Sequence, residues 1–148
     1  MLRHGLNYNR WVAADGRARG RQDPDVIVTA LRVVATDRHA SGGARPITSL
    51  AHVLIHGQDI RRPLGIERDL PEGHLVPVAE FVSADRHRFG AKRRIAGLTL
   101  TATDVAWSCG NGPEVRGRAE ALIMMMAGRS VALDDLSGEG KAALVSRR

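Results

Sequence analysis

The sequence predicts an α+β fold, in which helices precede a small antiparallel β-sheet and further helices follow the sheet. Two observations support this prediction. Up to about residue 90, apolar residues recur every three or four positions, which is the period of a helix. Beyond Gly90 the period shortens to two, as in strands, before a helical pattern returns near residue 118. The expected organisation is therefore a helical region, residues 1–90, followed by an α+β region, residues 91–148.

The helical region begins with a polar, arginine-rich segment, residues 9–21, which forms either a frayed helix or a loop because two glycines weaken it. Asp23 and Pro24 then supply an N-cap and a proline at the first helical position. This pair predicts a helix that runs to about residue 38.

Two further helices are expected after a glycine-rich loop. Thr48 or Ser49 caps the first, and Pro63 ends it after about Arg62. Pro71 opens the second, which continues past Pro77. The predicted spans are residues 48–62 and 71–88.

Alternating apolar and threonine residues predict the first strand of the α+β region. Trp107 lies at the centre of a second candidate strand, and a turn rich in glycine precedes a short third one. The predicted strands are residues 98–103, 105–109 and 114–116. Helices are expected over residues 118–127, where Gly128 occupies the C′ position, and over residues 137–146.

The composition is that of an ordinary globular protein, with 43% hydrophobic and 26% charged residues in 148. The longest apolar stretch, residues 119–127, is far shorter than the roughly 20 residues that cross a bilayer. The first residues do not resemble a secretory signal. We therefore expect a cytoplasmic protein without a membrane partner. Cys109 is the one cysteine, so no internal disulfide forms; its thiol is either a nucleophile or a small packing residue.

The net charge of +6 raises the question of nucleic-acid binding. Only 3% of residues are aromatic, which leaves few platforms for base stacking, and the arginines are spread along the chain. The densest basic run, Lys92 to Arg94, is read as a solvated loop. A DNA-binding regulator is therefore the least favoured of the functions considered.

A candidate metal site lies in the helix predicted over residues 48–62. His52 and His56 are four residues apart, which places both imidazoles on one face within reach of a single ion. Asp59, one turn later, is available to orient a ligand. The alternative is a pair of surface histidines, because six histidines placed at random in a chain of this length give such a spacing roughly one time in five. Candidates for a third ligand are His4, His39, His74 and His87.

Arg61 and Arg62 end the same helix. One interpretation is that they complement the helix dipole and reach solvent. The other is that they bind a carboxylate or an acidic cofactor close to the metal.

Several stretches resemble the mycothiol-dependent maleylpyruvate isomerase family, which has a DinB-like metal-binding fold. They occur in the family's order and cover most of the chain. The first is LAHVLIHGQDIRRPLG at residues 50–65, and the others are GLTLTATD at 97–104, Trp107, GPEVRG at 112–117, AEAL at 119–122, GR at 128–129 and ALDDL at 132–136.

The resemblance implies an incomplete DinB-like helical bundle in residues 1–90 that binds a divalent metal, usually zinc. It also implies that the metal activates the thiol of mycothiol, the actinobacterial counterpart of glutathione, for isomerisation of maleylpyruvate or transfer to another small electrophile. His56 matches a metal-ligating histidine of the family, and His52 stands where the family usually has Asp or Glu.

Members of the family normally have about two further helices upstream, one of which donates the first histidine. The expectation is thus either an isomerase or thiol transferase, or a truncated, non-catalytic binding module of the same fold. A missing bundle helix would expose an apolar groove, which predicts either a homodimer or poor solubility.

Overall fold

The computed structural model describes residues 8–36 and 45–147 of the chain. These residues belong to two compact units, residues 1–43 and residues 44–148, and each unit is described by itself. Within the described residues, no helix is both long enough and apolar enough to cross a membrane.

The first unit contains two helices, α1 (Tyr8–Arg19) and α2 (Pro24–Thr36). The arginine-rich segment is thus helical, and an ion pair of 2.8 Å between Arg19 and Asp15 spans one turn of it. The predicted cap of α2 is confirmed, because the Asp23 carboxylate accepts a hydrogen bond from the Asp25 N–H at 2.8 Å. None of the residues of α2 is buried.

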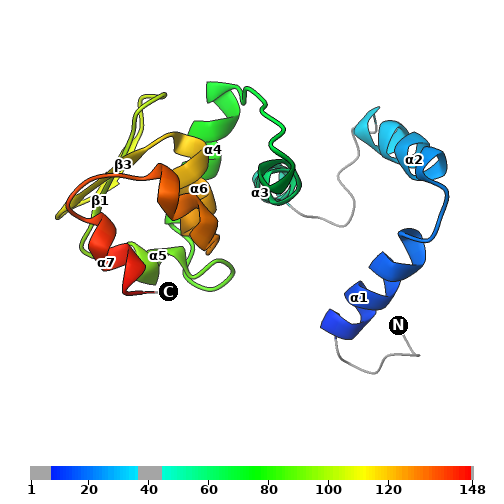
Figure 1. The fold of residues 1–148 in the computed structure, drawn as a ribbon, viewed down its shortest axis with the longest axis horizontal. Coiled ribbons are helices and arrows are strands. Elements are labelled where there is room, and N and C mark those ends of the chain that lie inside the picture. The colour runs from blue at the N-terminus through cyan, green and yellow to red at the C-terminus, as the bar shows by residue number, and fades with distance from the viewer. Residues whose placement is uncertain (1–7, 37–44, 148) are drawn as a thin grey trace. The chain divides into compact units, whose positions relative to one another are not determined.

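The second unit confirms the α+β class (Figure 1). Its elements are the helices α3 (Pro46–Leu64), α4 (Glu72–Ser83) and α5 (Ala91–Arg94), the strands β1 (Thr99–Ala102), β2 (Ser108–Gly110) and β3 (Glu114–Gly117), the helix α6 (Ala119–Met126), the 3-10 helix η2 (Ser130–Asp135) and the helix α7 (Lys141–Val145). The apolar helix α6 packs against α4, η2 and the sheet. Helices from both sides of residue 90 therefore share one core.

The bounds of the helices differ from the prediction in several places. Pro63 does not end α3, which continues to Leu64 and is capped by Gly65, and the basic run Lys92–Arg94, expected in a loop, belongs to α5. α3 begins at Pro46, which takes the first helical position, so neither Thr48 nor Ser49 caps it. α4 ends at Ser83, five residues earlier than predicted. Beyond it, the Asp85 carboxylate accepts the Phe89 N–H at 2.6 Å, and this side-chain bond replaces the backbone bonds of a continuing helix.

The sheet is mixed, so the prediction of an antiparallel sheet was wrong. β1 is the central strand, antiparallel to β2 and parallel to β3. The connection from β2 to β3 crosses the start of β1, where the Thr99 N–H donates to the Pro113 carbonyl. Gly112 makes this crossing possible: its φ is +132°, and a Cβ there would lie 2.2 Å from the Gly97 oxygen.

The second strand starts later than predicted. Trp107 lies in the turn before β2, where its carbonyl accepts the Ala102 N–H at 2.9 Å and its ring is buried. Asp104 explains the turn, because its carboxylate accepts the Ala119 N–H at 2.8 Å and so caps α6. Val105, Trp107 and Cys109 stand at every second position, and this local spacing predicts a strand although the chain turns here.

The C-terminal region also departs from the prediction. Residues 130–135 form the unpredicted η2, and the last helix is α7 rather than a helix over residues 137–146. Ser137 instead exchanges two backbone hydrogen bonds of 2.8 Å with Arg116, which extends the sheet by one bridge. The helix α6 and the C′ position of Gly128, with φ +89°, are as predicted.

Candidate metal and anion sites

The two histidines of the candidate metal site lie one turn apart on α3. The centroids of the His52 and His56 rings are 5.7 Å apart. The Nδ1 atom of His56 lies 3.0 Å from Oδ2 of Asp59. This contact fixes one ring nitrogen of His56 on the carboxylate and leaves Nε2 for another ligand, the arrangement that orients metal-binding histidines.

Arg129 holds the Asp59 carboxylate from a segment 70 residues away. Its Nε and Nη2 donate to Oδ1 and Oδ2 of Asp59 at 3.0 and 2.7 Å, and its Nη1 donates to the Ala127 carbonyl at 2.8 Å. Gly128 sets this geometry, because α6 ends there and the chain reverses, with the Arg129 N–H bonded to the Met124 carbonyl. The three side chains His56, Asp59 and Arg129 form a continuous hydrogen-bonded chain.

The electrostatics of this chain keep Asp59 ionised. The hydrogen bonds from Arg129 lower the pKa of Asp59, partial burial opposes them, and His56 adds to the lowering. The same contact raises the pKa of Arg129. For His52, burial is the largest cause of a lowered pKa, followed by repulsion from His56 and Arg88. A lowered pKa favours the neutral imidazole, which is the form that binds metals.

Within the part of the chain that the structure describes, no third metal ligand lies beside this pair. Across residues 8–36 and 45–147, no group of three or more His, Cys, Asp or Glu side chains is placed to hold a metal ion. Neither His74 nor His87 therefore completes the site within those residues. The other two candidates, His4 and His39, lie outside the described residues.

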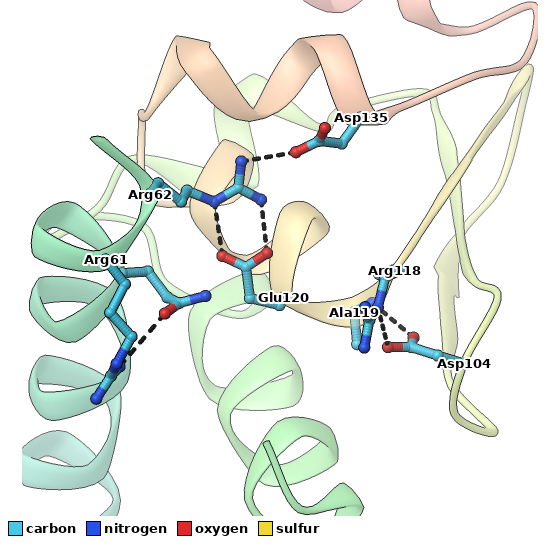
Figure 2. Close-up of polar contacts among 8 residues, drawn as sticks. Arg61, Arg62, Asp104, Arg118, Ala119, Glu120 and Asp135 are labelled. Carbon is cyan, nitrogen blue, oxygen red and sulfur yellow. Dashed lines mark hydrogen bonds and ion pairs between the residues drawn. The ribbon is translucent and has the colours of Figure 1, made fainter. Parts of the chain in front are cut away.

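Arg62 is bound to two carboxylates (Figure 2). Its Nε and Nη2 donate to Glu120 at 2.8 and 2.5 Å, and its Nη1 donates to Asp135 at 2.6 Å. The Glu120 hydrogen bonds are the largest cause of a raised pKa for Arg62, burial opposes them, and Asp135 adds to the rise. Both groups of the Arg62–Glu120 pair are mostly shielded from water, with side-chain exposures of 19% and 15%. This arginine anchors the end of α3 to α6 and η2.

Arg61 is less constrained. Its Nη1 donates to the Gln58 side chain at 3.3 Å (Figure 2), and the guanidinium folds back over Gly57, where a Cβ would lie 2.7 Å from Nη1. Arg61 also lines a cleft of about 390 Å³ at the C-terminal end of α3. Arg68 and Arg118 line the same cleft, together with several carboxylates. His52 and His56 do not line it.

Three side chains that complete these clusters received no role from the sequence: Arg129, Glu120 and Asp135. All three stand in stretches that carry the family resemblance. Spacing gave no signal for them, because they lie 58 to 73 residues from their partners on α3.

Cys109 is half-buried in β2 and packs against the core. Burial raises the pKa of its thiol, and a hydrogen bond with Ser83 opposes the rise. A raised pKa keeps the thiol protonated at neutral pH, which favours the packing role over the nucleophile.

A comparison with models of protein families, with curated proteins and with solved structures found no match to this chain.

Proposed function

We propose that this chain binds a divalent metal at His52 and His56 and uses it to activate a small thiol for reaction with an electrophile. The proposal includes the resemblance to the mycothiol-dependent maleylpyruvate isomerase family, with its DinB-like fold, mycothiol as the thiol and zinc as the metal. The observation that supports it best is the chain of side chains from His56 through Asp59 to Arg129. The Arg129 ion pair fixes the Asp59 carboxylate, and Asp59 contacts the His56 ring in the way that carboxylates orient metal-binding histidines.

The donor set fits a divalent metal in part. Two imidazoles on one turn and a carboxylate behind one of them are the ligand types that zinc takes. A catalytic zinc site usually has three protein ligands, and residues 8–36 and 45–147 contribute no third one. The metal therefore needs a further ligand from outside the described residues or from the bound thiol itself.

The roles of the protein groups follow from their contacts. His52 and His56 would hold the ion, and Asp59 would keep the His56 ring oriented with Nε2 outward. A bound metal would lower the pKa of a coordinated thiol, so that thiolate forms near neutral pH. Arg61, rather than Arg62, would contact an anionic group of the thiol or the electrophile, because Glu120 and Asp135 already neutralise Arg62.

The alternative is a non-catalytic binding module of the same fold, and the two-histidine ligand set favours it. The two functions differ in one measurable property, which is thiol-dependent turnover of an electrophile. A DNA-binding regulator is supported by the net charge alone.

The test is metal content, measured by elemental mass spectrometry on the purified chain, on His56→Ala and on His74→Ala. His74 is the matched control because it is an exposed histidine on another helix. We expect about one zinc per chain in the parent and in His74→Ala, and loss of the metal in His56→Ala. A parent without metal, or equal metal in all three proteins, would contradict the proposal.

A further inference from the structure

Arginines dominate a second cleft, on a different part of the second unit. The cleft has a volume of about 670 Å³ and is lined by residues of α5 and by the residues that follow α7. Figure 1 shows these two helices near each other, and Arg147 bonds to the Arg94 carbonyl. Its lining residues are Arg86, Gly90, Arg93, Arg94, Ala96, Ser146 and Arg147. Among the described residues, the lining thus includes four arginines and no aspartate or glutamate.

Two of these arginines are held in place by backbone carbonyls. Nη1 of Arg94 donates to the carbonyls of Phe89 at 3.2 Å and Met126 at 2.5 Å. Nη1 of Arg147 donates to the carbonyls of Arg94 at 2.9 Å and Ala96 at 2.8 Å. Carbonyl oxygens orient a guanidinium group without cancelling its charge, so the cleft is cationic and partly preorganised.

The arginines of this cleft differ from those of the candidate metal and anion sites in that no carboxylate of the described residues pairs with them. Arg62 and Arg129 each contact carboxylates, whereas no ion pair among the described residues includes an arginine of the cleft. The pKa of Arg94 is lowered, first by burial and then by repulsion from Arg93. Four arginines that line one cleft, without a counter-charge among the described residues, favour binding of a multivalent anion.

We propose that this cleft binds a small phosphate-bearing anion. Its volume lies in the range of small-molecule sites, roughly 300 to 1,000 Å³. Guanidinium groups match phosphate oxygens in pairs, so four of them suit a ligand with more than one phosphate group. The few aromatic residues of the chain argue against single-stranded nucleic acid as the occupant. This site is separate from the histidine pair and does not depend on the metal.

Titration calorimetry of the full chain with inorganic tripolyphosphate tests the proposal. The test variant is Arg86→Ala/Arg93→Ala, because both side chains are exposed and contribute to no core contact. The control is Arg45→Ala/Arg116→Ala, which removes the same charge from residues that do not line the cleft. We expect one binding site, an affinity about tenfold lower in the test variant, and an affinity within about twofold of the parent in the control.

Three outcomes would overturn the proposal. The first is absence of binding, and the second is an equal loss in both variants, which would mean a response to net charge alone. The third is binding of duplex DNA or of vesicles containing phosphatidylserine that tripolyphosphate does not displace, which would identify a macromolecular surface. An Arg86→Lys/Arg93→Lys variant guards against unfolding: it should bind more tightly than the alanine variant, and equally weak binding would also count against the proposal.

Discussion

Arg62 and Glu120 lie 58 residues apart in sequence and meet through two hydrogen bonds of 2.8 and 2.5 Å. The pair joins the last turn of α3 to the first turn of α6 (Figure 2). Glu120 is also favourably placed at a helix N-terminus, where the helix dipole stabilises a negative charge. Arg62, for which the sequence leaves open a role at the helix dipole and a role in ligand binding, thus holds two helices together.

The first prediction concerns this pair. Glu120→Gln keeps the size of the side chain but removes its charge, so that Asp135 is the only carboxylate left to Arg62, which is 19% exposed. We expect the free energy of unfolding in urea to fall by about 2 kcal/mol, the usual worth of hydrogen bonds to a charged group. Glu139→Gln is the control, because Glu139 is exposed and should change stability by less than about 0.5 kcal/mol. Equal stability of the two variants would mean that the pair contributes nothing.

The second prediction is a pH dependence of stability at Asp59. Arg129 lowers the pKa of Asp59 in the folded state below its ordinary value of 3.8. The folded state therefore binds fewer protons than the unfolded state in the interval between the two pKa values. The stabilisation is complete above the unfolded pKa and disappears as the pH falls through the folded pKa. We expect the difference in unfolding free energy between the parent and Asp59→Asn to shrink as the pH falls from about 5 toward 3. A difference that grows on acidification would contradict the assignment.

The third prediction follows from the raised pKa of Cys109, whose largest cause is burial. Alkylation by iodoacetamide at pH 7.5 should be slower in the folded chain than in urea, because only the thiolate reacts. The rate in the folded chain should rise with pH beyond the point where the rate in urea levels off. Faster alkylation in the folded chain would revive the nucleophile interpretation.

Local patterns predicted the elements that local interactions determine. Asp23 with Pro24 fixed the start of α2, and the apolar run before Gly128 gave α6 within one residue. The sheet topology was missed because the order of the strands depends on contacts between distant segments. Gly110 and Gly112 allow the chain to cross β1, because a Cβ on either residue would collide with the backbone before β1. The local sequence around them nevertheless indicates only an ordinary turn.

In the candidate site too, contacts within one helix could be predicted from the sequence, whereas contacts between distant segments could not. The spacing of His52, His56 and Asp59 on one helix follows from helical geometry alone, and the structure brings these side chains together. Arg129 comes from a loop after α6, so no periodicity could indicate its contact with Asp59. A choice between the two interpretations of Arg62 also needs the tertiary structure, because its partners, Glu120 and Asp135, come from α6 and η2.

The fourth prediction tests the crossing over β1. Gly112→Ala would place a Cβ 2.2 Å from the Gly97 oxygen at a φ of +132°, which only glycine adopts readily. We expect a loss of about 3 kcal/mol in unfolding free energy or failure to fold. Gly73→Ala is the matched control: a Cβ there meets nothing within 4 Å, and its place in α4 predicts a gain of about 0.5 to 1 kcal/mol. Equal effects of the two substitutions would show that the crossing is not constrained.

The fifth prediction concerns the outer face of α3, where Val53, Ile60 and Leu64 are 72%, 64% and 65% exposed. Their spacings of seven and four residues place them in one stripe along the helix, and burial of that stripe against a second copy would remove apolar surface from water. We expect the parent chain to associate in light scattering and Val53→Ser/Ile60→Ser to shift it toward the monomer. Val131→Ser/Val145→Ser is the control, because it removes two exposed valines outside α3 and should leave the association unchanged. A monodisperse monomer in the parent would contradict a homodimer, and an equal shift in the control would mean that general surface hydrophobicity, rather than α3, drives the association.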